Sequence, residues 1–198
     1  MENKESILID WINKGYDICI PGGTGRNGSN AAFDCLGYRF PDKKYEIIVL
    51  PIRRKSYDEY KEEQENNFIL PYESPFKIIK REIAEELTIF INADKTFLVT
   101  QKAEQDSRKG FENKFHRKYL FFSESYNARH MRTTLSDKEP NLGIPIGISL
   151  GLLKKYLWEG HRWMIEPIEI YTKYRVDHFP PAKHVLPQKR VNKLLCAV

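Results

Sequence analysis

The chain has 198 residues, of which 41% are apolar and 30% are charged. That apolar content is enough for a buried core, so the composition excludes a wholly disordered chain and favours a soluble, single-domain globular protein. The 32 lysines and arginines exceed the 27 aspartates and glutamates by a net charge of +5. This mild excess is compatible with an anionic small molecule, with RNA or with no particular partner. Dedicated nucleic-acid binders usually concentrate their basic residues on one helix or stripe.

The first 52 residues divide into a helix, a strand and a hairpin, with a loop of small residues before the hairpin. Glycines in that loop would let backbone N–H groups approach a phosphate. The loop lacks both the Lys-Ser/Thr end of a P-loop and the GxGxxG spacing, so a plain connection is the favoured interpretation. The predicted elements are a helix over 5–14, a strand over 16–20, the loop over 21–30, and hairpin strands over 33–40 and 45–52.

Helical and extended patterns alternate through the rest of the chain. They predict a helix over 74–87, strands over 96–101 and 119–123, a helix carrying Leu150, Leu153 and Leu157, and a last strand over 165–174. Because strands and helices are interleaved, the expected fold class is α/β or α+β.

The three cysteines, Cys19, Cys35 and Cys196, are far apart and form no CxxC or Cys/His pattern. This spacing predicts neither a zinc site nor a disulfide framework, and it favours reduced thiols in a cytoplasmic protein. The first residues also lack the pattern of a secretory signal. The longest uncharged stretch, Asn141 to Leu153, is too short and too interrupted by glycine to cross a bilayer, so no membrane partner is expected.

The helix predicted over 74–87 has an acidic side next to an apolar side. At about 100° per residue, Glu82, Glu85 and Glu86 fall within one sector of about 100°. Like charges at this spacing destabilise a bare helix, and a divalent cation would turn their repulsion into attraction. Mg²⁺ prefers such hard oxygen ligands. The alternative is a solvated acidic surface, which is common on helices.

The spacing of these residues resembles the Nudix box, G-x5-E-x7-R-E-U-x-E-E-x-G-U, in which U is a bulky aliphatic residue. Glu73 is followed by seven residues and then by the run Arg81-Glu82-Ile83-Ala84-Glu85-Glu86, and Ile89 ends the box. Every charged position is therefore filled. The two glycines of the box are replaced, by Asn67 and Thr88. Threonine is the costlier replacement if that position is left-handed.

The resemblance implies an αβα sandwich around a mixed sheet. It divides the chain into an N-terminal helix and connecting loop (1–30), a Nudix domain (31–178) and a basic C-terminal tail (179–198). The implied activity is metal-dependent hydrolysis of the diphosphate linkage in a nucleoside diphosphate derivative (NDP-X), with Mg²⁺ or Mn²⁺ as cofactor. A homodimer is also in keeping with the family.

The resemblance also assigns roles to the box residues. Glu82, Glu85 and Glu86 would be metal ligands, and one of them, or a later glutamate, would act as base. Arg81 would pair with Glu73 or Glu85 to fix the geometry of the site. The implied catalytic residues are therefore Arg81, Glu82 and Glu85.

Several residues outside the box are candidates for completing the site. A further acidic residue is expected, and Glu139 is preferred over Glu104, Glu112 and Glu124. Trp163 could stack on a base, although core packing is the commoner use of such an aromatic residue.

Two alternative functions remain open at this stage. The replaced glycines allow a Nudix-fold nucleotide-binding or regulatory module with weak catalysis. The net positive charge allows an enzyme that processes RNA ends, which is less favoured than hydrolysis of a small nucleotide.

Overall fold

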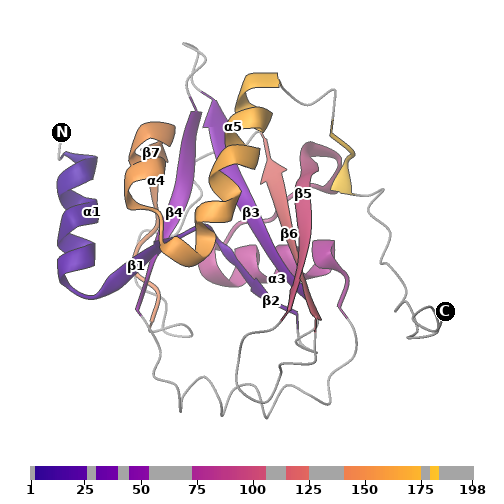
Figure 1. The fold of residues 1–198 in the computed structure, drawn as a ribbon, viewed down its shortest axis with the longest axis horizontal. Coiled ribbons are helices and arrows are strands. Elements are labelled where there is room, and N and C mark those ends of the chain that lie inside the picture. Colours follow the sequence, from indigo (N-terminus) through magenta and orange to yellow (C-terminus); the bar gives the residue numbers. More distant parts are fainter. Residues whose placement is uncertain are drawn as a thin grey trace.

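The computed structural model of this chain describes residues 3–25, 30–39, 45–53, 73–105, 115–124, 141–174 and 179–182. Its centre is a sheet of seven strands (Figure 1). Five strands run in the order β1-β4-β3-β6-β5, while β2 pairs with β3 and β7 pairs with β4. The β3–β6 pair is parallel and the other pairs are antiparallel, so the sheet is mixed. The strands are β1 (Tyr16–Cys19), β2 (Gly22–Thr24), β3 (Asn30–Arg39), β4 (Tyr45–Arg53), β5 (Thr96–Gln105), β6 (Phe115–Ser123) and β7 (Ile146–Ser149).

Helices cover both faces of this sheet, as Figure 1 shows. One face packs against α3 in a core that includes Ile79 and Ile83. The other face packs against the remaining α-helices, with Leu8, Leu153 and Ile168 in a second core. The helices are α1 (Lys4–Asn13), α3 (Pro75–Leu87), α4 (Leu150–Tyr156) and α5 (Ile165–Tyr174), with 3-10 turns η1 (Ala93–Lys95) and η3 (Glu159–Met164). The αβα sandwich around a mixed sheet is therefore confirmed.

Most of the predicted elements are present near their expected limits. The first helix, the first strand and both hairpin strands appear as α1, β1, β3 and β4. The acidic helix, the two strands after it and the leucine-bearing helix appear as α3, β5, β6 and α4. Cys19 and Cys35 are both buried. Within the described ranges, no helix is both long and apolar enough to span a membrane.

The prediction of a strand over 165–174 is wrong, because these residues form helix α5. The stretch is rich in isoleucine and tyrosine, which favour strands in isolation. Its buried residues, however, are Ile168 and Tyr171, and their spacing of three places them on one side of a helix against the sheet. Tertiary packing therefore decides the conformation.

The prediction of a plain connection over 21–30 is partly wrong as well. Its residues 22–24 form strand β2, which pairs antiparallel with β3. The Asn67, Glu112 and Glu139 predictions and residues 183–198 of the basic tail lie outside the described residues.

Candidate active site

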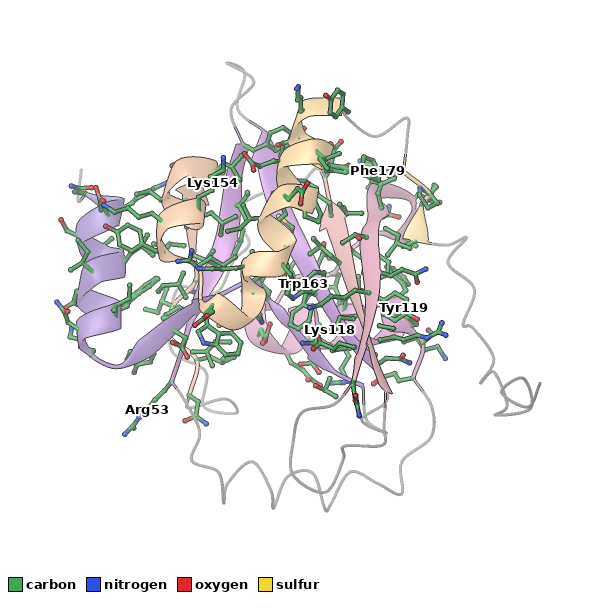
Figure 2. The ribbon with its side chains drawn as sticks, viewed as in Figure 1. Arg53, Lys118, Tyr119, Lys154, Trp163 and Phe179 are labelled. Carbon is green, nitrogen blue, oxygen red and sulfur yellow. The ribbon has the colours of Figure 1, made fainter. Side chains whose placement is uncertain are left out.

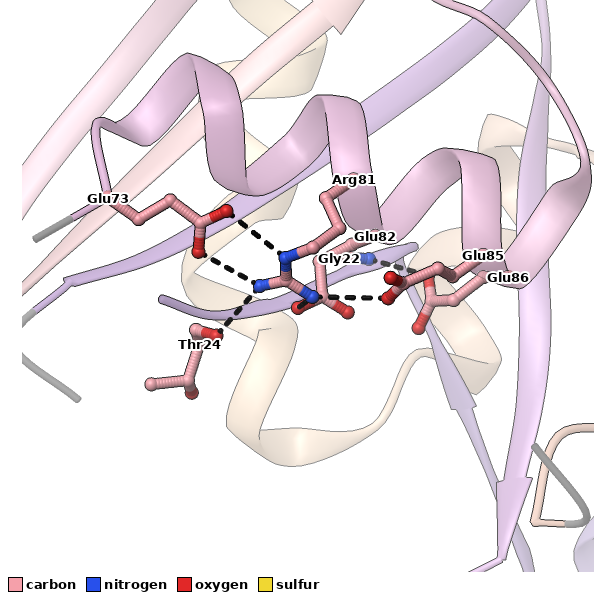
Figure 3. A network of polar contacts seen from close by, with 7 residues as sticks. All are labelled: Gly22, Thr24, Glu73, Arg81, Glu82, Glu85 and Glu86. Carbon is pink, nitrogen blue, oxygen red and sulfur yellow. Dashed lines mark hydrogen bonds and ion pairs between the residues drawn. The ribbon is translucent and has the colours of Figure 1, made fainter. Parts of the chain in front are cut away.

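Helix α3 fixes the position of the acidic residues because one side of it is buried against the sheet. It begins after Ser74 with Pro75 in its first turn, where proline needs no hydrogen-bond partner for its nitrogen. Ile79, Ile83 and Leu87 are fully buried. The helix is therefore held in one orientation, which sends the box glutamates towards β2 (Figure 3).

Arg81 is the hub of the polar network in Figure 3. Its Nε and Nη2 each donate to one carboxylate oxygen of Glu73, both at 3.1 Å. Its Nη1 donates to Glu85 at 3.1 Å and forms an ion pair with Glu82 at 2.7 Å. Arg81 thus contacts both predicted partners, Glu73 and Glu85, and it joins the loop before α3 to the acidic side of the helix.

Burial and neighbouring charge both act on Glu82, whose side chain is only 17% exposed. Burial raises the pKa of Glu82 to about 7, and the charges of Glu85 and Glu73 add to this rise while Arg81 opposes it. Burial lowers the pKa of Arg81, but hydrogen bonding to Glu73 and the charge of Glu82 outweigh burial and raise it. Arg81 therefore remains a cation beside a carboxylate that can hold or release a proton near neutral pH.

Glu86 binds strand β2 directly. Its side chain is buried, and its Oε2 accepts a hydrogen bond of 2.9 Å from the backbone N–H of Gly22. The neighbouring Thr24 carbonyl lies 3.5 Å from Nη2 of Arg81. Strand β2 and helix α3 therefore form the candidate site together.

Two consecutive glycines allow β2 to come this close. Gly22 has a φ of +136°, and a Cβ there would lie 2.3 Å from the carbonyl oxygen of Ala32. A Cβ on Gly23 would lie 2.6 Å from the carboxylate carbon of Glu82. These glycines were expected in a plain connection rather than in the site, although glycine in a strand often marks a close backbone approach.

Thr88, which replaces the second glycine of the box, has a left-handed backbone. Thr88 has φ 62° and ψ 28°, a left-handed conformation, and its N–H donates to the carbonyl of Ala84. It is the only non-glycine residue with a positive φ in the described ranges. The position therefore has the backbone for which glycine is best suited, as the box pattern implies.

The other acidic candidates that the structure describes have partners elsewhere. Glu104 on β5 forms ion pairs with Lys102 and Lys118. Glu124, just after β6, accepts a hydrogen bond of 3.3 Å from the hydroxyl of Tyr45. The identity of a further acidic residue stays a prediction.

Comparisons with known proteins give fold resemblances alone. No family model and no curated protein matches the chain. An Ap4A hydrolase from C. elegans, in a binary complex, is 12% identical, with a TM-score of 0.49 over 73% of this chain and 98% of its own. A NUDIX hydrolase from Listeria monocytogenes is 14% identical, with a TM-score of 0.48 over 72% and 92%. A Nudix hydrolase from M. smegmatis is 11% identical, with a TM-score of 0.47 over 78% and 96%. The chain is thus similar to solved Nudix proteins, and its function has to be inferred from its own site residues.

Proposed function

We propose that this protein is a metal-dependent Nudix-type hydrolase that cleaves the diphosphate linkage of a nucleoside diphosphate derivative. One observation carries this proposal. The charged residues of the Nudix box are far more specific in their spacing than an ordinary acidic helix. Glu73, Glu82 and Glu85 gather around Arg81, and Glu86 binds the adjoining strand β2. A solvated acidic surface would need neither the half-buried Glu82 nor the buried Glu86.

The donor atoms of the site fit a hard divalent cation. Glu82, Glu85 and Glu86 offer carboxylate oxygens, the ligands that Mg²⁺ and Mn²⁺ prefer. No group of three metal-ligating side chains is already assembled among the described residues. Arg81 contacts Glu82 and Glu85, while Glu86 accepts from Gly22. Metal binding would therefore compete with Arg81 for two of the three carboxylates.

The bound cation would neutralise charge on the diphosphate and acidify the attacking water. The residues of the chain have distinct tasks around it. Arg81 is a positioning residue, because its guanidinium links Glu73 to the acidic side of α3. One of Glu82, Glu85 and Glu86, or a later glutamate, would accept the proton of the attacking water. The Gly22 N–H fixes the orientation of Glu86.

The first test is hydrolysis of a panel of NDP-X compounds with Mg²⁺ or Mn²⁺, using wild type and Glu86→Gln. Glutamine still offers an oxygen to the Gly22 N–H, so the fold should persist while one negative charge is lost. We expect diphosphate cleavage by wild type and a loss of at least about 100-fold in the variant, a scale typical of a removed electrostatic stabiliser. Glu166→Gln, on the exposed first turn of α5, is the matched control and should keep full activity.

Each outcome separates the candidate functions. Near-normal activity of Glu86→Gln would show that the metal site is wrongly assigned. A folded wild type that binds nucleotides but cleaves none of the panel would instead support the nucleotide-binding module.

A further inference from the structure

A row of residues crosses four strands on the sheet face opposite α3. In the strand register, Thr24 of β2 lies opposite Ala31, Ala31 lies opposite Lys118, and Lys118 lies opposite Lys102. Directly opposed residues share one face of a sheet. The Nζ of Lys102 lies 4.9 Å from the centre of the Trp163 ring, which belongs to η3 on that same face.

The two lysines of this row, Lys102 and Lys118, form a cationic site with excess charge. Like charges directly opposite each other on neighbouring strands are destabilising. Within the described part of the chain, Glu104 is the one carboxylate that pairs with both amines. Burial of Glu104 raises its pKa, but hydrogen bonds from the two lysines outweigh burial and lower it, so the carboxylate stays ionised. Among the described residues the two amines therefore share one carboxylate, and an anion would neutralise the remaining positive charge.

Both lysines are held in place before any ligand arrives. Their side chains are only 36% and 26% exposed, and attractions between partly buried charges are stronger than those in open solvent. The Trp163 ring also attracts the ammonium group of Lys102. Little conformational freedom would be lost on binding, which favours affinity.

Strand β2 connects the lysine row to the acidic site. Strand β2, where the row begins, also contacts Glu86 through Gly22 and Arg81 through Thr24. Two strand spacings separate β2 from Lys118, which is about 10 Å. Figure 2 labels Lys118 in the lower half of the sheet, on the side where Figure 1 labels β2, with Trp163 above it. A ligand that reaches both places has to extend beyond one diphosphate group.

We propose that Lys102 and Lys118 bind a phosphate group of the substrate beyond the diphosphate that is cleaved. Lysine ammonium groups form strong, charge-assisted hydrogen bonds with phosphate oxygens. The preferred substrates of the proposed hydrolase would then carry chains of three or more phosphates rather than a diphosphate joined to a sugar. This inference rests on the proposed function and narrows its substrate class. A free polyphosphate nucleotide and the 5′-triphosphate end of an RNA share this chemistry.

Binding of inorganic tripolyphosphate without metal tests the lysine site independently of catalysis. Calorimetric titrations would compare wild type with the double variant Lys102→Gln/Lys118→Gln. The control, Lys154→Gln/Lys155→Gln, removes two lysines that pair with Glu169 and Glu5 on the surface. We expect the Kd to rise at least about tenfold in the first variant, the scale of a hydrogen bond to a charged group, and less than about twofold in the control. Equal affinity in all three proteins, or no binding by wild type, would overturn the proposal.

Steady-state kinetics of the Lys102→Gln/Lys118→Gln variant test whether this site binds the substrate. The lysine variant should raise KM for a dinucleoside tetraphosphate at least about tenfold, with kcat preserved and KM for ADP-ribose unchanged. An equal rise for both substrates would contradict the proposal. Absence of hydrolysis by wild type would reject the proposed function while leaving the binding result in force. Titration with a 5′-triphosphate RNA, its 5′-hydroxyl form and a free nucleoside triphosphate decides which source of the phosphate chain binds more tightly.

Discussion

Thr88 shows how one residue can keep a backbone conformation that does not suit it. With a φ of 62° its backbone is left-handed, a conformation in which Cβ crowds the backbone, and the box has glycine at this position. That conformation costs a non-glycine residue roughly 1–2 kcal/mol, part of which glycine returns through its larger freedom in the unfolded chain. We expect Thr88→Gly to raise the free energy of unfolding by about 1 kcal/mol. Urea unfolding followed by circular dichroism measures the change.

The substitution Thr88→Ala is the control for this prediction. Alanine removes the β-branch and the hydroxyl, which donates to the Leu87 carbonyl, but it keeps the Cβ that causes the strain. It should therefore bring little or no gain. If glycine and alanine were equally stabilising, the β-branch rather than the left-handed backbone would be the source of the cost.

At the scale of elements, the site depends on how closely strand β2 approaches helix α3. A methyl group on Gly23 would overlap the Glu82 carboxylate, which is the flexible end of a side chain. We therefore expect Gly23→Ala to displace Glu82 with little effect on folding. Misplacement of a reacting group by about 1 Å can cost about 100-fold in rate. Turnover on the substrate found in the panel and Mn²⁺ affinity should both fall, while the free energy of unfolding changes by less than about 1 kcal/mol.

The matched control for Gly23→Ala is Gly151→Ala in helix α4. The nearest atom to a Cβ there is the Ser149 hydroxyl at 3.9 Å, so alanine fits. Gly151 lies in the first turn of α4, where this exchange should stabilise the fold by less than about 1 kcal/mol and leave turnover unchanged. Full activity of Gly23→Ala would show that Glu82 does not need the position it has here.

The same two elements show what the sequence can and cannot predict. Helix α3 was predictable because its apolar period, its start at Pro75 and its box residues are all local in the chain. Strand β2 was not, because it is defined by pairing with β3 and by contacts with residues far along the chain, such as Glu82 and Glu86. Helix α5 was mistaken for a strand because its residues favour extension until the sheet buries one side of them.

The stability of the whole molecule includes the cost of a carboxyl group in its core. Asp34 on β3 is fully buried, with the Ser123 hydroxyl donating to its Oδ2 at 2.5 Å. Burial raises the pKa of Asp34 from 3.8 to about 7, although the hydrogen bonds from Ser123 oppose this. His161 acts in the opposite direction, because burial and the charge of Lys118 lower its pKa to about 3. Its neutral Nδ1 accepts from the N–H of Ile20.

In wild type the opposite contribution of His161 masks the effect of Asp34 on the pH dependence of stability. We expect the effect of Asp34 to appear in the difference in stability between wild type and Asp34→Asn. Between about pH 4 and pH 7 the unfolded chain loses the Asp34 proton while the folded protein keeps it, so this group makes folding less favourable as the pH rises. The accumulated cost above pH 7 is on the order of 4 kcal/mol. The contribution of His161 has the opposite slope, but it is common to both proteins and cancels in their difference.

Urea unfolding from pH 4.5 to 8.5 should therefore show Asp34→Asn gaining stability over wild type as the pH rises, with Asp10→Asn on the surface of α1 as control. A constant difference would mean that Asp34 is already ionised in the folded protein at the lowest pH.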